Sequence, residues 1–140
     1  MQAIAEGMNP FCAERTVEGE VLFLSSPRDV IKLIKSGALK EYILLVRGGT
    51  TTFLAPALQS GATGVITMSG APESHLGILS REFQIPCVMS VHLAEGVGRY
   101  VAGETDEDHF QQIVDSLNGK RVRLDATTPG VGKIFEIGTE

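Results

Sequence analysis

The 140-residue sequence has no tryptophan, few aromatic residues and only two cysteines, Cys12 and Cys87. Two cysteines are too few for a disulfide framework, and their spacing matches no usual zinc pattern. No apolar run approaches the roughly 20 residues of a membrane helix, and the first residues show no basic region followed by an apolar core. A net charge of −5 disfavours the basic surface that nucleic-acid binding needs. We therefore expect a cytoplasmic protein with no membrane or nucleic-acid partner.

What the sequence does contain is a regular succession of strand and helix patterns within the length of one domain. Apolar runs predict strands at residues 21–24, 42–46, 64–67 and 85–89, and the 42–46 run is apolar enough for burial on both faces. Residues 26–34 and 106–117 show helical spacing, and Gly37 is placed to end the first helix. Residues 1–16 lack clear periodicity and are expected to form an N-terminal arm, either a poorly packed leader or an interaction arm. The fold class predicted for residues 17–140 is α/β.

The most informative segment contains a histidine at the expected start of a helix. Gly70 and Pro72 predict a loop, Ser74 is a suitable N-cap, and the apolar face is expected to comprise Leu76, Ile78, Leu79 and Phe83. A helix start offers unpaired backbone N–H groups and the positive end of the helix dipole. Both favour a phosphoryl group, so His75 stands where a covalently attached phosphate could be held.

This segment resembles the phosphohistidine, or swivelling, domain of the phosphoenolpyruvate-utilising enzymes. That family's signature is Gly-Gly-x-Thr-Ser-His, small and aliphatic residues, Ala-Arg-Glu, and then Ile-Pro-Ala-Val. The residues in register with it here are Gly70, Ser74, His75, Arg81, Glu82, Ile85, Pro86 and Val88. Weaker similarity extends from about residue 17 to about residue 136.

The resemblance implies a swivelling β/β/α domain of short strands flanked by helices, with His75 phosphorylated on its ring. Gly70, Ser74 and Arg81 are the expected phosphate-supporting residues. No tightly bound cofactor and no metal site are expected on this chain. Magnesium and either ATP or phosphoenolpyruvate belong on partner domains, so the expected partners are nucleotide-binding and acceptor-binding protein chains. The expected function is a phosphotransferase component that needs those partners for turnover, and self-association into a homo-oligomer is left open.

Several residues depart from the family pattern. Ala71 replaces the second glycine, Glu73 replaces the threonine, and Ser90 stands where a glycine usually follows the Ile-Pro strand. The stretch from 91 to 117 is longer than the usual connection. We interpret Glu73 as a modulating residue. The departures also leave an alternative, a non-catalytic binding or assembly module that kept the fold and lost phosphoryl transfer.

Other chemistries fit the sequence poorly. Ser74 and His75 are neighbours and would point about 100° apart on a helix, so they do not form a nucleophile–base pair. His75, His92 and His109 lack the spacing of metal ligands on one helix face. The Gly48-Gly49-Thr50-Thr51 turn lacks the glycine-lysine end of a P-loop, which favours a helix-capping role.

Overall fold

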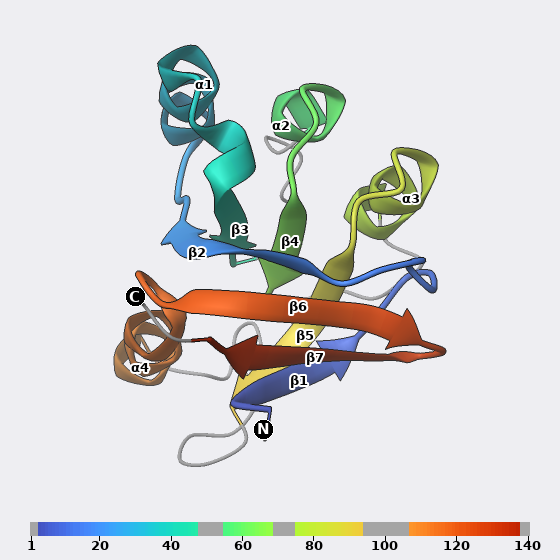
Figure 1. Ribbon diagram of the computed structural model, residues 1–140. Coiled ribbons are helices and arrows are strands. Elements are labelled where there is room, and N and C mark those ends of the chain that lie inside the picture. The colour runs from blue at the N-terminus through green and yellow to red at the C-terminus, as the bar shows by residue number, and fades with distance from the viewer. Residues whose placement is uncertain (1–2, 48–54, 69–74, 94–106, 138–140) are drawn as a thin grey trace.

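The computed structural model describes residues 3–47, 55–68, 75–93 and 107–137. Seven strands close into a mixed barrel in the order β1-β5-β4-β3-β2-β6-β7, and β7 pairs with β1 (Figure 1). The run β2-β3-β4-β5 is parallel, whereas the other neighbouring pairs are antiparallel. This arrangement confirms the expected α/β fold of short strands flanked by helices.

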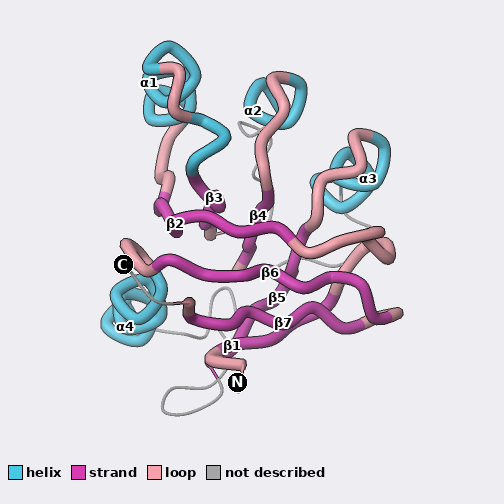
Figure 2. The backbone as a smooth tube through the Cα atoms, viewed as in Figure 1, coloured by secondary structure: helices cyan, strands magenta, loops and turns pink. Residues whose placement is uncertain are grey.

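The strands are β1 (Ala5–Met8), β2 (Val17–Phe23), β3 (Tyr42–Val46), β4 (Gly64–Thr67), β5 (Cys87–Leu93), β6 (Arg121–Thr128) and β7 (Val131–Glu136). The helices are α1 (Pro27–Ser36), the 3₁₀ turn η1 (Leu39–Glu41), α2 (Ala55–Gln59), α3 (His75–Glu82) and α4 (Glu107–Leu117). As Figure 2 shows, α1, α2 and α3 lie side by side along the parallel strands. In the described part of the chain, no helix is long and apolar enough to cross a membrane.

The α1 helix shows how local sequence sets an element's limits. Ser26 is the N-cap, and its hydroxyl accepts a hydrogen bond from the Asp29 backbone N–H at 3.3 Å. Pro27 occupies the first turn, where its missing N–H costs no intrahelical hydrogen bond. Gly37 ends the helix with a left-handed φ of 79°, as its position in the sequence predicts.

The parallel strands are buried on both faces, as the apolar run at 42–46 predicts. Ile43 and Leu45 belong to a cluster inside the barrel, together with residues of β6, β7 and α4. Leu44 and Val46 belong to a second cluster beneath the helices α1 and α2. Alternate residues of one strand therefore serve two cores, because side chains alternate between the faces of a sheet.

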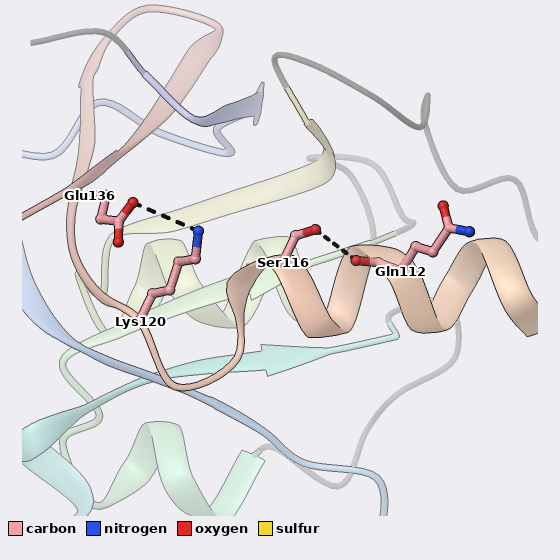
Figure 3. A network of polar contacts seen from close by, with 4 residues as sticks. All are labelled: Gln112, Ser116, Lys120 and Glu136. Carbon is pink, nitrogen blue, oxygen red and sulfur yellow. Dashed lines mark hydrogen bonds and ion pairs between the residues drawn. The ribbon is translucent and has the colours of Figure 1, made fainter.

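The α4 helix packs its apolar side against the barrel interior through Phe110, Ile113, Val114 and Leu117. Polar contacts lie near the junction between α4 and β6 (Figure 3). The Ser116 hydroxyl donates to the Gln112 carbonyl oxygen at 2.8 Å, and Lys120 Nζ lies 3.7 Å from Glu136 Oε1 on β7. These contacts are exposed, so burial of the apolar side supplies most of the helix's stability.

The N-terminal segment differs from the expected arm. Residues 5–8 form β1, which pairs with both β5 and β7 and so closes the barrel. Ala5 is fully buried and lies in register with Leu93 on one side and Ile134 on the other. The expectation of poor packing is wrong because a four-residue strand containing Glu6 and Gly7 shows no apolar alternation. Its partners lie more than 80 residues away in the sequence, and only the closed fold reveals them.

The β5 strand is longer than the expected 85–89 strand and runs to Leu93. It therefore includes the start of the stretch from 91 to 117, whose last part forms α4. Residues 94–106 lie outside the described part of the chain.

Candidate functional site

The strand topology places the start of α3 at the carboxyl edge of the parallel strands. β3, β4 and β5 run parallel, so their carboxyl ends lie at the same edge of the sheet. His75 is the first residue of α3, which follows β4 along the chain. The predicted helix start at His75 is confirmed, while Gly70, Ala71, Glu73 and Ser74 lie outside the described residues.

The buried side of α3 differs in part from the expected apolar face, of which the Leu76 side chain lies outside the described part of the structure. Gly77 and Ser80 are buried, whereas Ile78 is 49% exposed and Phe83, which lies beyond the helix end, is 41% exposed. Leu79 is only partly buried, against the cluster beneath the helices. The small residues at 77 and 80 share one side of the helix, and their size lets its backbone approach the sheet closely. Gly77 and Ser80 therefore lie on the buried side of α3, and the helix keeps an exposed apolar side chain, Ile78, three residues after His75.

Arg81 lies in the last turn of α3, six residues after His75. The axial rise over six residues is about 9 Å, so the Arg81 backbone is near the far end of the helix. The Arg81 carbonyl accepts hydrogen bonds from the Gln84 backbone N–H at 3.2 Å and from Gln84 Nε2 at 2.6 Å. These bonds help to terminate the helix. A role for the Arg81 guanidinium in supporting phosphate stays a prediction.

A second arginine stands at the carboxyl edge, and the site prediction did not include it. Arg47 directly follows β3, and its Cζ lies 3.8 Å from the centroid of the Phe110 ring. Phe110 is 4% exposed and meets Phe23 edge to face, with ring centroids 5.7 Å apart. Phe110 is distant from Arg47 in the sequence, so the sequence alone could not reveal this contact. The signal that was available is an arginine immediately after the apolar run of a predicted buried strand.

Thr67, the last residue of β4, is a buried polar residue near the same edge. It is fully buried, and its Oγ1 has no hydrogen-bond partner among the described residues. An unpaired buried hydroxyl is unfavourable, and most such groups in folded proteins find a partner. The register pairs Thr67 with Val46, so Thr67 and Arg47 are close along neighbouring strands.

Ser90 shows why a glycine usually occupies its position. Its φ is 52°, in the left-handed region that residues with a side chain disfavour. The register between β1 and β5 shifts at the same place, between the Glu6–His92 and Met8–Met89 pairs. The departure identified in the sequence therefore falls on a strained position of a β-bulge.

Cys87 lies under α3 and does not serve as a reactive thiol. Burial raises the pKa of the Cys87 thiol to about 12, and the Ser80 hydroxyl beside it opposes part of the rise. The Ser80 Oγ makes no hydrogen bond of good geometry among the described residues, so burial dominates. Cys12, in contrast, is exposed.

A groove on the described surface lies away from the start of α3. It has a volume of about 920 Å³, and its walls include Arg15, Lys40, Thr63, Phe83 and Pro86. Lys40, Thr63 and Pro86 precede β3, β4 and β5, so the groove faces the amino edge of the parallel strands. It is thus remote from the start of α3.

Of the three histidines, His92 is the one whose side chain lies in the described part of the structure. His92 Nε2 lies 3.7 Å from Glu6 Oε1 across the β1–β5 pair. Within the described ranges, no group of three or more His, Cys, Asp or Glu side chains could hold a metal ion.

Residues 39–128 match the family described as PEP-utilising enzyme, mobile domain. The match covers well over half of the chain and includes β3 to β6, with the start of α3 between them. No curated protein matches the sequence significantly. The chain therefore belongs to the PEP-utilising enzyme mobile domain family, whose members typically carry a phosphohistidine and act in phosphotransferases.

Proposed function

We propose that this chain is a phosphoryl carrier in which His75 forms the phosphohistidine. The observation that carries the proposal is the place of His75, the first residue of α3 at the carboxyl edge of the barrel, inside the region that matches the family. The first N–H groups of a helix have no intrahelical partner, and they can donate to phosphoryl oxygens.

The chemistry requires a neutral imidazole with one unprotonated ring nitrogen. That nitrogen attacks the phosphorus atom of the donor in line with the leaving oxygen, and the N–P bond forms as the P–O bond breaks. The leaving oxygen keeps the electron pair of the broken bond, and the imidazole releases its proton. Transfer to an acceptor repeats the exchange, with an acceptor oxygen as the nucleophile.

We further propose that the nucleotide or phosphoenolpyruvate site lies on a partner chain, as does the acceptor site. The described residues form one barrel with its helices, and a groove on their surface faces the edge opposite the start of α3. Magnesium would act at the donor site of the partner, where it neutralises phosphate charge.

The test is incubation of the purified chain with ATP or with phosphoenolpyruvate, in the presence of cell extract, followed by mass spectrometry under alkaline conditions. We expect one phosphoryl group, stable in alkali and labile in acid, on His75. The His75→Gln variant should lose the label and keep its thermal unfolding midpoint. Label that persists in that variant, or that maps to His92 or His109, would refute the assignment. A complete absence of label with every donor would favour the non-catalytic module.

A further inference from the structure

The outward side of α1 concentrates positive charge in an acidic chain. Its inward side consists of Val30 and Leu33, which are buried, and Ile34, which is partly buried in the cluster beneath the helices. From residue 30 to residue 72 the sequence has a single acidic residue, Glu41, although the whole chain carries a net charge of −5. The exposed residues that share one side of the helix, at spacings of three and four, form what we call the basic face: Arg28, Ile31, Lys32 and Lys35.

The three cations of the basic face are not neutralised by their surroundings. Within the described part of the chain, no ion pair involves Arg28, Lys32 or Lys35. Asp29 is the one carboxylate of α1, and its Oδ2 accepts hydrogen bonds from the backbone N–H and the hydroxyl of Ser25, both at 3.1 Å. The Ser25 backbone hydrogen bond is the main cause that lowers the pKa of Asp29, and the charge of Lys32 is the least. The carboxylate is therefore held at the start of the helix and leaves the cations available.

The same charges weaken the helix that carries them. Lys32 lies four residues after Arg28 and three before Lys35, so like charges are neighbours on the helix surface and repel one another. Arg28 also lies in the first turn, where a cation opposes the helix dipole, whereas Lys35 in the last turn suits it. Ile31 lies among these cations and is 47% exposed. Residues that conflict with local stability in this way are typical of functional sites, where a partner compensates for the cost.

We propose that the basic face of α1 docks an acidic segment of a partner protein. Carboxylates of that segment lie opposite Arg28, Lys32 and Lys35, and an apolar side chain of the segment packs on Ile31. The carboxylates relieve the repulsion along the helix, and the apolar contact removes Ile31 from water. The inference does not require a phosphoryl group at His75, because α2 lies between α1 and α3 and separates the basic face from the start of α3 (Figure 2).

The composition of the basic face favours a protein over other anionic partners. Nucleic-acid phosphates offer Ile31 no apolar contact, and a polyanion is repelled by the net negative charge of the chain. A membrane surface takes up the whole apolar side of a helix, but the other apolar residues of α1 pack against the sheet and are not free to insert. An acidic segment with one apolar side chain matches both the charge of the face and its exposed isoleucine.

The experiment measures the binding of a fluorescent synthetic peptide to the full chain by fluorescence anisotropy. The peptide consists of glutamate and alanine at helical spacing, with one leucine among the glutamates. A second peptide has serine in place of that leucine. An oligothymidylate and vesicles of phosphatidylserine with phosphatidylcholine probe the two other classes of partner. Backbone NMR of the isotope-labelled chain identifies the residues whose signals shift when the leucine peptide binds.

The variants are Lys32→Glu and Ile31→Ser, each with a matched control on the far side of the barrel. Lys133→Glu makes the same charge change at an exposed lysine of β7, and Val131→Ser removes an apolar side chain of β7 that is 36% exposed. Lys133 differs from Lys32 in its surroundings, because it lies in register with Glu6 and Asp125. Thermal unfolding is recorded for every variant.

We expect the leucine peptide to bind more tightly than the serine peptide and to shift NMR signals mainly in α1. Lys32→Glu should weaken binding about tenfold, because an attraction becomes a repulsion, and added salt should reduce this difference. Ile31→Ser should weaken binding roughly fivefold, since an apolar contact is lost. Both controls should bind as the wild type does. The melting temperature of Lys32→Glu should rise slightly, because a like-charge neighbour is removed from Arg28 and Lys35.

Several results would overturn the inference. An equal loss in Lys32→Glu and Lys133→Glu would indicate only a general effect of net charge. NMR shifts centred on other elements, equal affinity for the two peptides, or no saturable binding of the leucine peptide would exclude the docking site. Tighter binding of the oligothymidylate or the vesicles would assign the basic face to a nucleic acid or a membrane instead of a protein. None of these results depends on labelling of His75, so the proposed function stands or fails separately.

Discussion

Replacement of Gly7 by alanine tests whether β1 closes the barrel as the structure shows. A Cβ added at Gly7 would lie 2.3 Å from the Met89 carbonyl oxygen and 3.2 Å from the Val91 Cα. The closest atom belongs to the backbone of β5, so it cannot move aside without disturbing the strand pairing. Overpacking of this kind costs about 2 to 3 kcal/mol in the free energy of unfolding. In a protein of this size, that loss lowers the melting temperature by roughly 5–10 °C.

The assay is equilibrium unfolding in guanidinium chloride and by heat, with Gly37→Ala as the control. Gly37 also requires a glycine, because its φ is 79°, but a Cβ there would meet no atom within 4 Å. We therefore expect the control to lose only about 1 kcal/mol, the typical penalty for a left-handed residue with a side chain. A Gly7→Ala variant that loses no more than the control would refute the close approach of β1 to β5.

Further predictions concern the β-bulge at Ser90, the two thiols and Glu73, which departs from the family pattern. Ser90→Gly should raise the unfolding free energy by about 0.5 to 1 kcal/mol, because glycine relieves the left-handed φ of 52°, and a loss of stability in denaturant titration would contradict the strain. A thiol reagent at pH 8 should react at once with Cys12 alone and with Cys87 only after unfolding, because burial raises the Cys87 pKa to about 12. The Cys87 thiol ionises at a lower pH in the unfolded chain than in the folded protein. Its contribution to the free energy of unfolding should therefore be complete below pH 9 and fall as the pH rises toward 12. A comparison with Cys87→Ala across this pH range would measure the change. Glu73→Thr should raise the phosphorylated fraction of His75 at fixed donor concentration, with the gain shrinking as salt rises; a lower fraction would make Glu73 a working part of the site.

The elements that the sequence predicts well are those set by local signals. Ser26, Pro27 and Gly37 define α1, and the apolar run before Arg47 defines a strand that is buried on both faces. The start of α3 follows from the family motif. These features depend on residues close together in the chain, so local sequence patterns predict them.

The features that were missed depend on contacts between distant segments. β1 has no strand pattern of its own and owes its conformation to β5 and β7. On α3, Gly77 and Ser80 are buried while the larger Ile78 is exposed, and which residues face the sheet depends on how the helix packs on distant strands. Similarly, the contact of Arg47 with Phe110 becomes visible only once α4 packs on the barrel.

The most direct test of the central claim is a chase experiment on phosphorylated protein. The chain is labelled on His75 with radioactive phosphoramidate, freed of the donor and added to cell extract, and the label remaining on His75 is followed over time against a buffer control. The carrier account predicts that extract removes the label faster than hydrolysis in buffer and that a second molecule gains it. A label that leaves His75 at the buffer rate, with no labelled acceptor, would contradict the account.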